Sequence, residues 1–527
     1  MNIVRWSLMS NYLEPEKVPS ANLLMGYVQS IPTEALTKWL PDNPYTRKLT
    51  IWATSVIFTG LFAAMMLPNG EMAVALTALI TAIAGTILFG EERMPLVIVG
   101  LMMLPLGGLG DFHGIVENME WVLFIKLVAL LTWVDFLNHT KYFEHLIERY
   151  LPRQLHGFPL IALLCTLAAF SAALIDEVNS IVLWYFVTKA IIGFTPKGKL
   201  KLKAASWTAI VILLVSATNI GSQFLPLGNP VGIAISVISG LSAVDFITYA
   251  WLPGIVTLIY FNLRVRYRFR SLIWEFKSVT VEDSDFEVLE EHMDQYEVIE
   301  YEETPTSNAT HPVEHKAVPI PILHSLFGIG VIGLVLATPV SNFFNYSPET
   351  GLGIFVLALF AGTLFVGSNF GRHTELVLRE LPWNTLFFIV FLFGIAHGLE
   401  TSGLTESAAE QIYSTFGANE IAVRVVIVLV AALVTAFMDN VIAVAVIAPI
   451  IIALGDRGFE THGLWFSLLS AAVVAGNLTP IGSTANIIAN AKIKSSWGSW
   501  WKTGGILAVE CLIVNQVLLY LWEQVIR

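Results

Sequence analysis

Two short polar passages interrupt the most apolar parts of this chain, and each places a carboxylate within hydrophobic sequence. The first passage, Ser171–Val178, contains Asp176 and Glu177. The second passage, Val434–Val441, contains Asp439. An ionisable group at the centre of a bilayer costs roughly 2.5–3.5 kcal/mol on insertion scales, so these carboxylates are candidates for binding an ion or transferring a proton. The alternative is that they cap helices or pair with a buried cation.

Each carboxylate passage is followed by a proline–glycine break in the next apolar segment. The breaks contain Pro226–Pro230 and Pro480–Thr484, and polar side chains surround both. We expect the first of these segments, which starts at about Ala204, to be unwound from Ser216 through Pro230. Interrupted hydrophobic segments at matching positions of two halves indicate a transporter binding site, because unwound backbone and helix ends can hold an ion there. The candidate ion- or substrate-binding residues are Asp176, Glu177, Asn179, Ser180, Thr218, Asn219, Ser222, Asn229, Asp439, Asn440, Asn477, Thr479, Ser483, Thr484 and Asn486.

The composition is that of a membrane protein. Hydrophobic residues make up 55% of the 527 residues, charged residues make up 13%, and the mean hydropathy is +0.69. Apolar stretches such as 121–137 and 352–367 are long enough to cross about 30 Å of hydrocarbon as helices. Cys165 and Cys511 lie in apolar segments and indicate neither a disulfide framework nor a metal site. The chain has no Walker A motif, which argues against direct ATP coupling, and we expect a secondary transporter and not an enzyme.

The distribution of Lys and Arg predicts the path of the chain across the membrane. The apolar region 159–194 has basic residues at both ends, which favours a re-entrant hairpin that enters and leaves on one side. The region 423–454 fits a second hairpin. We therefore predict an all-α polytopic membrane protein with about eleven transmembrane helices in two inverted-topology repeats, each with a re-entrant hairpin and a broken helix.

We predict four regions. Residues 1–48 form a cytoplasmic or interfacial segment, and residues 49–265 form the first span and the first repeat. Residues 266–319 form an acidic linker, and residues 320–527 form the second repeat. Residues 271–318 contain thirteen Asp and Glu against two Lys, which accounts for nearly all of the net charge of −12. The linker has too little apolar content to form a domain and is expected to be flexible, with partner docking or regulation as the alternative. We expect an integral protein of the cell (inner) membrane, with the amino terminus and the linker cytoplasmic.

The fourth predicted spans of the two halves indicate an internal duplication. Glu120–Thr140 aligns without gaps on Pro382–Ser402, and this alignment places Asp135 opposite His397. Lys126 lies near the middle of the predicted span Trp121–His139. We treat Lys126, Asp135 and His397 as candidate coupling charges. The alternatives are structural pairing for Lys126 and snorkelling of the other two side chains to the interface.

The second-half motif resembles the ion transporter superfamily. It combines the tip residues Asp439-Asn440 with a broken helix over Gly476–Asn486 that reads GNLTPIGSTAN. That superfamily includes citrate-transporter-like proteins, arsenite efflux permeases, sodium–proton antiporters and sodium–dicarboxylate symporters. The resemblance covers roughly residues 70–265 and 320–525. The first half departs from the antiporter pattern, since Asp176-Glu177 stands where that pattern has Asp-Asn and Asn229 stands where it has Asp.

Carboxylates at both tips favour a cation site, because an anion site avoids fixed negative charge near its substrate. The leading hypothesis is Na⁺/proton antiport, with Na⁺ and/or H⁺ as coupling ions, no cofactor and no metal other than Na⁺. Transport of small anions (citrate-like carboxylates, arsenite- or silicate-type solutes) is the alternative, because Asn229 and Lys126 reduce the negative field. A sodium-coupled anion carrier satisfies both observations. There are two minor alternatives. One is a membrane scaffold, and the other is an intramembrane aspartyl protease, which the sequence Gly108–Asp111 suggests.

The expected partners follow from these hypotheses. They are the lipid bilayer and a small inorganic ion or small anion as substrate, with no nucleic acid. A homodimer is a candidate assembly.

Overall fold

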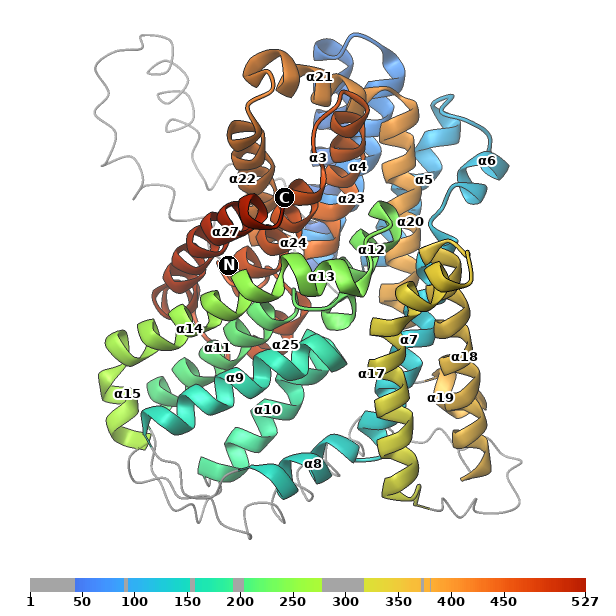
Figure 1. Cartoon of the computed structure of the whole chain (residues 1–527). Coiled ribbons are helices and arrows are strands. Elements are labelled where there is room, and N and C mark those ends of the chain that lie inside the picture. Colours follow the sequence, from blue (N-terminus) through green and yellow to red (C-terminus); the bar gives the residue numbers. More distant parts are fainter. Residues whose placement is uncertain are drawn as a thin grey trace, which may run out of the picture.

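The computed structural model describes residues 43–89, 93–151, 157–192, 203–276, 317–370, 374–379 and 381–527. In these residues the chain is helical and contains no strand (Figure 1). Nine of the described helices are long and apolar enough to cross a membrane, or ten if one bent pair counts as a span. The all-α polytopic membrane class is therefore confirmed. The predicted leader up to residue 42 and the acidic stretch 277–316 lie outside the described residues.

The first half begins with two long helices and ends with the arginine-rich helix α14 and the short helix α15. Its elements, of which η3 is a 3₁₀-helix, are α3 (Pro44–Met66), α4 (Gly70–Phe89), α5 (Met94–Leu106), α6 (Phe112–Glu117), α7 (Trp121–His139), α8 (Tyr142–Tyr150), α9 (Phe158–Ile175), α10 (Glu177–Ile192), α11 (Ala204–Gly221), η3 (Pro226–Gly228), α12 (Pro230–Ser239), α13 (Ala243–Tyr249), α14 (Trp251–Arg268) and α15 (Arg270–Glu275).

The second half follows the same order of long and short helices. Its elements, of which η5 is a π-helical turn, are α17 (Ile320–Phe343), α18 (Pro348–Asn369), α19 (Thr374–Arg379), α20 (Trp383–Thr401), α21 (Leu404–Phe416), α22 (Glu420–Phe437), α23 (Asn440–Asp456), α24 (His462–Gly476), α25 (Thr484–Ile493), α26 (Trp497–Trp500), η5 (Trp501–Gly505) and α27 (Ile506–Ile526).

Helices α7 and α20 show how closely the two halves correspond. Both contain 19 residues, and each begins at the tryptophan that the ungapped alignment pairs. Trp121 donates its ring N–H to the carbonyl of Val116, and Trp383 donates in the same way to Leu378, five residues upstream in each case. These matching contacts support the internal duplication. The opposite orientation of the two repeats in a membrane stays a prediction.

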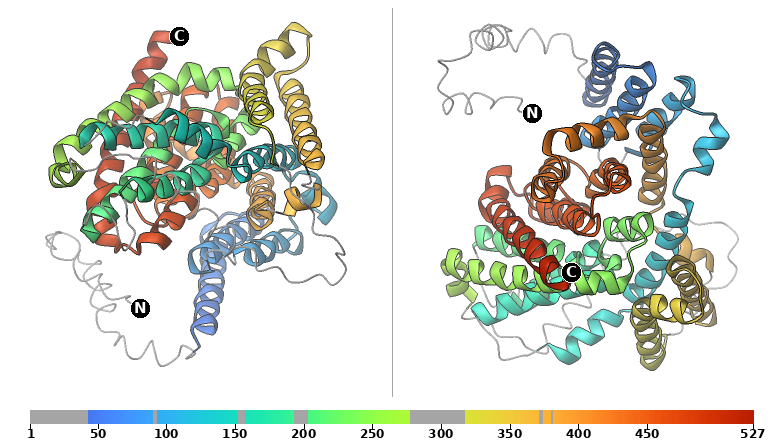
Figure 2. Two further views of the ribbon diagram at one scale, coloured as in Figure 1. Left: turned by 90° about the horizontal axis from the view of Figure 1, so that it is seen from below. Right: turned by 45° about the horizontal axis from the view of Figure 1, so that its top comes forward.

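The two halves pack through reciprocal contacts. Helix α5 packs against α20 while α7 packs against α18, and α10 packs against α25 while α12 packs against α23. Pairs α3–α4 and α17–α18 lie on different sides of the bundle in both views of Figure 2. The helices that carry the hairpin and break motifs therefore meet in the interior, where most of their apolar side chains are buried.

The two predicted hairpin regions each form a pair of helices joined by a tight turn. In the first half, α9 ends at Ile175 and α10 begins at Glu177, so Asp176 alone forms the turn. In the second half, Met438 and Asp439 separate α22 from α23. Helices α9 and α22 are themselves long and apolar enough to span a membrane. The re-entrant path of both hairpins therefore stays a prediction.

The first broken helix starts later than we predicted. We expected unwound chain from residue 216, but α11 continues to Gly221 and the break starts at Ser222. The hydroxyl groups of Ser216 and Thr218 donate to carbonyls three or four residues upstream, so these polar residues are satisfied within the helix. The second break, after Gly476, has the predicted position.

The two breaks have the same backbone geometry. A Cβ atom on Gly228 would overlap the carbonyl of Ser222, and a Cβ atom on Gly482 would overlap the carbonyl of Gly476, six residues upstream in both halves. Each break therefore turns back against the end of the helix that precedes it. The helix that follows is capped by a side chain, from Asn229 in the first half and from Ser483 in the second.

We expect Gly482→Ala to lower the free energy of unfolding by roughly 1–3 kcal/mol, because backbone atoms of Gly476 and Thr435 leave no room for a methyl group. Thermal unfolding of the purified chain in detergent measures the effect. The matched control is Gly362→Ala in α18, since no atom lies within 4 Å of the added carbon there. Equal unfolding midpoints for Gly482→Ala and Gly362→Ala would contradict the close backbone packing described at the second break.

Candidate functional site

A cavity of about 380 Å³ lies where the two hairpin turns meet the two breaks. Its walls come from both halves, with α7, α10 and α12 on one side and α20, α23 and α25 on the other. Four acidic side chains face it, together with Arg93, Lys141 and His139. The predicted site residues that line it are Asp135, Asp176, Glu177, Asn179, Asn229, Asp439, Asn440 and Thr484.

Asp176 is the residue that forms the first hairpin turn. One of its oxygens accepts hydrogen bonds from the backbone N–H groups of Val178 (2.5 Å) and Asn179 (3.1 Å), and so caps α10. The Asn179 amide donates to the other oxygen at 2.8 Å and to Asp135 at 3.3 Å. Asp176 also has a φ of +65°, which non-glycine residues rarely adopt and which is typical of functional sites.

Glu177 is the most deeply buried carboxylate of the cavity, with 2% of its surface exposed. Its Oε2 has no partner at hydrogen-bond geometry in the part of the chain that the structure describes, although the Ser222 hydroxyl and the Asn440 amide lie near the carboxylate. Asp176 and Asp439 lie close enough to interact with it electrostatically. A buried anion beside two other carboxylates requires a proton or a cation to offset the repulsion.

Asp439 joins the second hairpin turn to both a cation and a break. Its Oδ1 accepts from the backbone N–H of Val441 at 3.1 Å and caps α23. Its Oδ2 accepts from Arg93 Nη1 at 2.9 Å and from the Thr484 hydroxyl at 3.1 Å. The Arg93 guanidinium also lies 4.1 Å from the ring centroid of Phe388. Asp439 is thus both a cap and half of a largely buried ion pair, with side-chain exposures of 11% for Arg93 and 7% for Asp439.

A buried amide network lies behind the cavity and links the two halves. The Asn219 amide donates to Asn477 (2.7 Å), Ser483 (3.2 Å) and Asn486 (3.0 Å). Asn486 in turn donates to the carbonyls of Gly476 and Thr479 in the second break. These residues hold the shape of the breaks and do not line the cavity.

The other predicted site residues of the first half are also held by internal hydrogen bonds. Ser180 donates to the carbonyl of Ala168, and Thr218 donates to that of Val215. Ser222 donates to the carbonyl of Asn219 and accepts from Asn229 at 2.8 Å. Their positions fit a role in supporting the site.

Two of the three candidate coupling charges lie away from this cavity. Lys126 is buried and lines a separate, mostly apolar cavity with Leu130 and Leu174. His397 lies 3.9 Å from Glu400, one helical turn along α20, and does not line the cavity. Asp135 alone faces the cavity beside the hairpin turn.

Sequence reasoning did not identify Arg93, His139 or Lys141 as site residues. Each lies at the end of a helix, where basic residues are common at the membrane surface. Only the fold brings Arg93 to Asp439, which is 346 positions away in the sequence. An arginine directly before the apolar helix α5 is the one signal that the sequence carries.

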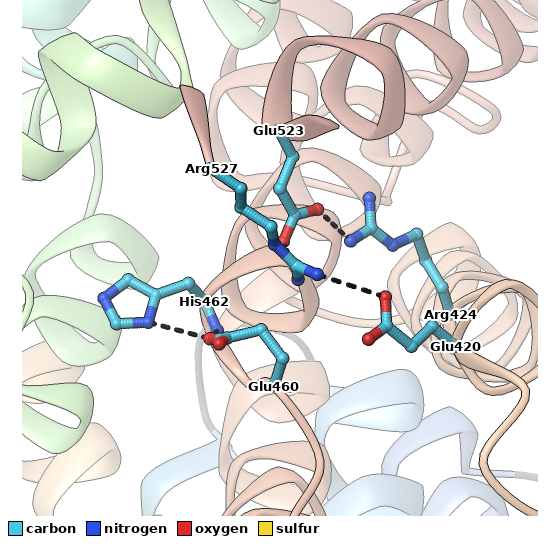
Figure 3. Close-up of polar contacts among 6 residues, drawn as sticks. All are labelled: Glu420, Arg424, Glu460, His462, Glu523 and Arg527. Carbon is cyan, nitrogen blue, oxygen red and sulfur yellow. Dashed lines mark hydrogen bonds and ion pairs between the residues drawn. The ribbon is translucent and has the colours of Figure 1, made fainter. Parts of the chain in front are cut away.

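An ionic cluster anchors the far end of the hairpin arm α22 (Figure 3). Glu523 of α27 forms an ion pair with Arg424 of α22. It forms a second ion pair with Arg527, whose Nη2 lies 2.6 Å from Glu523 Oε1. Arg527 also reaches Glu420 at 3.4 Å. Glu523 and Arg424 are 2% and 6% exposed. Gly463 of α24 makes room for the pair, because a Cβ atom there would overlap both side chains.

We expect Arg424→Met to lower the free energy of unfolding by roughly 3 kcal/mol. This value is at the lower end of the range for breaking a buried ion pair, because Arg527 still compensates the charge of Glu523. Arg424→Met with Glu523→Leu should recover most of this loss, since no buried charge then lacks its partner. Thermal unfolding in detergent measures both effects. In the control Arg457→Met the partners Glu406 and Glu410 are exposed, so the midpoint should not change. Equal midpoints for Arg424→Met and the wild type would contradict the anchoring role.

The sequence model of the citrate transporter family (CitMHS) matches residues 86–407 and 343–522 of this chain. These matches cover well over half of the chain, including both hairpin turns and both breaks. The chain therefore belongs to the citrate transporter family. The predicted resemblance to the ion transporter superfamily is confirmed.

Relatives of this chain include several membrane proteins. An uncharacterized transporter of Mycobacterium tuberculosis is 24% identical over 466 residues, which is 85% of this chain and 98% of that protein. The 46 kDa membrane protein of Mycobacterium leprae is 24% identical over 419 residues, or 78% of this chain and 88% of that protein. The P protein of Homo sapiens is 23% identical over 441 residues, or 72% of this chain and 50% of that protein. Together with the apolar helices, these matches make the chain an integral membrane transporter.

Proposed function

We propose that this chain is a secondary active transporter of the cell membrane that exchanges a small cation, with Na⁺ as the leading candidate, for protons. The observation that carries the proposal is the unpartnered, buried Oε2 of Glu177 between two other carboxylates. Such a group is stable when it holds a proton or when a cation neutralises it, and the two states exclude one another. Competition between a proton and a cation for this one site couples the proton flux to the cation flux.

The cavity supplies further ligands of the right chemistry. Hard cations prefer oxygen ligands, and the carboxylates of Asp135, Asp176 and Asp439 all face the same space as Glu177. The four acidic side chains outnumber Arg93 and Lys141, so the cavity as a whole is negative when all four are ionised. Among the described residues no three His, Cys, Asp or Glu side chains are grouped so that they could hold a metal ion together.

Transport of a small carboxylate or oxyanion is the second candidate function. Two donors favour it, since the Arg93 guanidinium lines the cavity and the buried Asn440 Nδ2 lies near Glu177 but has no partner at hydrogen-bond geometry among the described residues. Arginine is suited to binding carboxylates through two parallel hydrogen bonds. A volume of about 380 Å³ is also more than a single cation needs. A cation bound at Glu177 would then be the coupling ion for the anion.

Reconstitution into liposomes with a trapped pH indicator separates these candidates. We expect an outward shift of protons when Na⁺ or Li⁺ is added outside, and none when choline replaces them. Uptake of labelled citrate, measured in the same liposomes with and without Na⁺, tests the second candidate. Citrate uptake with no cation-driven pH change would favour the anion carrier. Absence of both activities in liposomes that contain correctly folded chain would contradict the proposed function.

A further inference from the structure

A second recess lies where α9 starts and α14 and α15 meet, at the other end of α9 from the first hairpin turn. It is an open groove of about 880 Å³. Its lining is basic and aromatic, and the residues that carry its chemistry are Phe158, Arg266, Tyr267, Arg270 and Trp274. Helix α9 is a candidate membrane span that begins at Phe158, so the groove lies where a span leaves the hydrocarbon.

The arginines of this region divide into two pairs with different roles. Arg264 holds Glu510 of α27 through two hydrogen bonds at 2.7 and 2.6 Å, and Arg268 donates to the carbonyl of Lys502. Arg266 and Arg270 instead face the groove. Among the described residues neither has a carboxylate within ion-pair distance.

Aromatic rings position these two guanidinium groups. Arg266 lies 5.2 Å from the ring centroid of Phe158, and Arg270 lies 5.0 Å from that of Tyr267. Cation–π contacts of this kind hold a guanidinium in place and leave its N–H groups free to bind an oxyanion. Tyr267 and Trp274 are 71% and 68% exposed, as expected of side chains at the level of lipid headgroups.

The groove has a fixed floor. The backbone N–H of Gly157, directly before α9, donates to the carbonyl of Phe276, directly after α15, at 2.9 Å. Leu272 of α15 and Phe276, which follows α15, are both buried. Glu275, the residue after Trp274, lies 4.0 Å from Lys203. The site is therefore a preformed basic recess beside a membrane span.

We propose that this groove binds the headgroup of an anionic phospholipid, with Arg266 and Arg270 on the phosphate and Tyr267 and Trp274 against the upper part of the acyl chains. Basic pockets between spans on the cytoplasmic side recognise acidic headgroups, and we predict this end of the bundle to be cytoplasmic. The proposal is independent of the transport site. It assigns a lipid ligand to the junction of hairpin arm α9 with α14.

Binding of short-chain phosphatidylglycerol to the purified full chain in detergent, followed by native mass spectrometry, tests the proposal. Each guanidinium near an anionic headgroup contributes about fivefold in affinity, so Arg266→Gln with Arg270→Gln should weaken binding about 30-fold. Phosphatidylcholine should bind weakly to both forms. Arg266→Lys with Arg270→Lys should keep much of the affinity, which shows that the glutamine variant fails for lack of charge and not of folding.

The matched control is Arg149→Gln, because Arg149 also stacks on an exposed aromatic ring, that of Tyr150 at 5.8 Å, but does not line the groove. Its affinity for phosphatidylglycerol should equal that of the wild type. Unchanged affinity in the double glutamine variant would overturn the proposal. So would equally tight binding of inorganic phosphate. Binding that appears only after deletion of residues 278–312 would also overturn it, since the acidic segment of the chain itself would then be the occupant.

Discussion

We expect Asp439→Asn to abolish cation-coupled transport in liposomes while the chain still folds and inserts. Asparagine caps a helix about as well as aspartate, so the bond to Val441 N–H survives the change. The substitution removes the negative charge that Arg93 and the Thr484 hydroxyl contact. It also removes a group that could bind a proton or a cation. Proton flux driven by Na⁺ measures the loss.

A second variant separates the two roles of Asp439. The single substitution leaves Arg93 largely buried without its partner, which is itself destabilising. Arg93→Gln with Asp439→Asn removes both charges and should restore the unfolding midpoint toward that of the wild type. We expect this double variant to remain inactive. Recovery of transport in the double variant would show that Asp439 is only the counter-ion of Arg93.

We expect Glu177→Gln to eliminate coupled transport without loss of stability. Glutamine has nearly the shape of glutamate, and it removes a buried charge that has an unpartnered oxygen, so the unfolding midpoint should stay equal or rise. Flux should fall to that of liposomes without protein, because the site then holds neither a proton nor a cation. Uptake assays and thermal unfolding on one preparation measure both effects.

The control for this substitution is Glu117→Gln, since Glu117 is an exposed glutamate of α6 that lies outside the cavity. It should transport like the wild type. Wild-type rates of Na⁺-dependent flux in Glu177→Gln would instead assign the coupling role to another carboxylate, and Asp176 would be the next to test.

The local features of the fold could be predicted from the sequence because they depend on short-range chemistry. Apolar length indicates the spans, and proline and glycine mark the breaks. The bounds of α7 match the prediction from Trp121 to His139. The start of the first break was wrong by six residues, because Ser216 and Thr218 satisfy their hydroxyl groups inside the helix.

The long-range features could not be predicted in the same way. The three hairpin carboxylates Asp176, Glu177 and Asp439 were predicted as site residues, and all three line one cavity. Nothing in the sequence pairs Asp439 with Arg93, because that contact depends on how α5 packs against α20 and α23. Asn219 was predicted as an ion or substrate ligand. Its side chain instead donates hydrogen bonds to Asn477 and Asn486 in the second break and does not line the cavity.

Protection of Glu177 from chemical modification by Na⁺ tests the central claim most directly. Dicyclohexylcarbodiimide reacts with protonated carboxyl groups in apolar surroundings, and mass spectrometry of the digested chain identifies the residue that is modified. If Glu177 alternates between a proton and a cation, the reagent should modify it in liposomes, and Na⁺ or Li⁺ but not choline should suppress the modification in a concentration-dependent manner. Modification of Glu177 to the same extent at every Na⁺ concentration would contradict the claim.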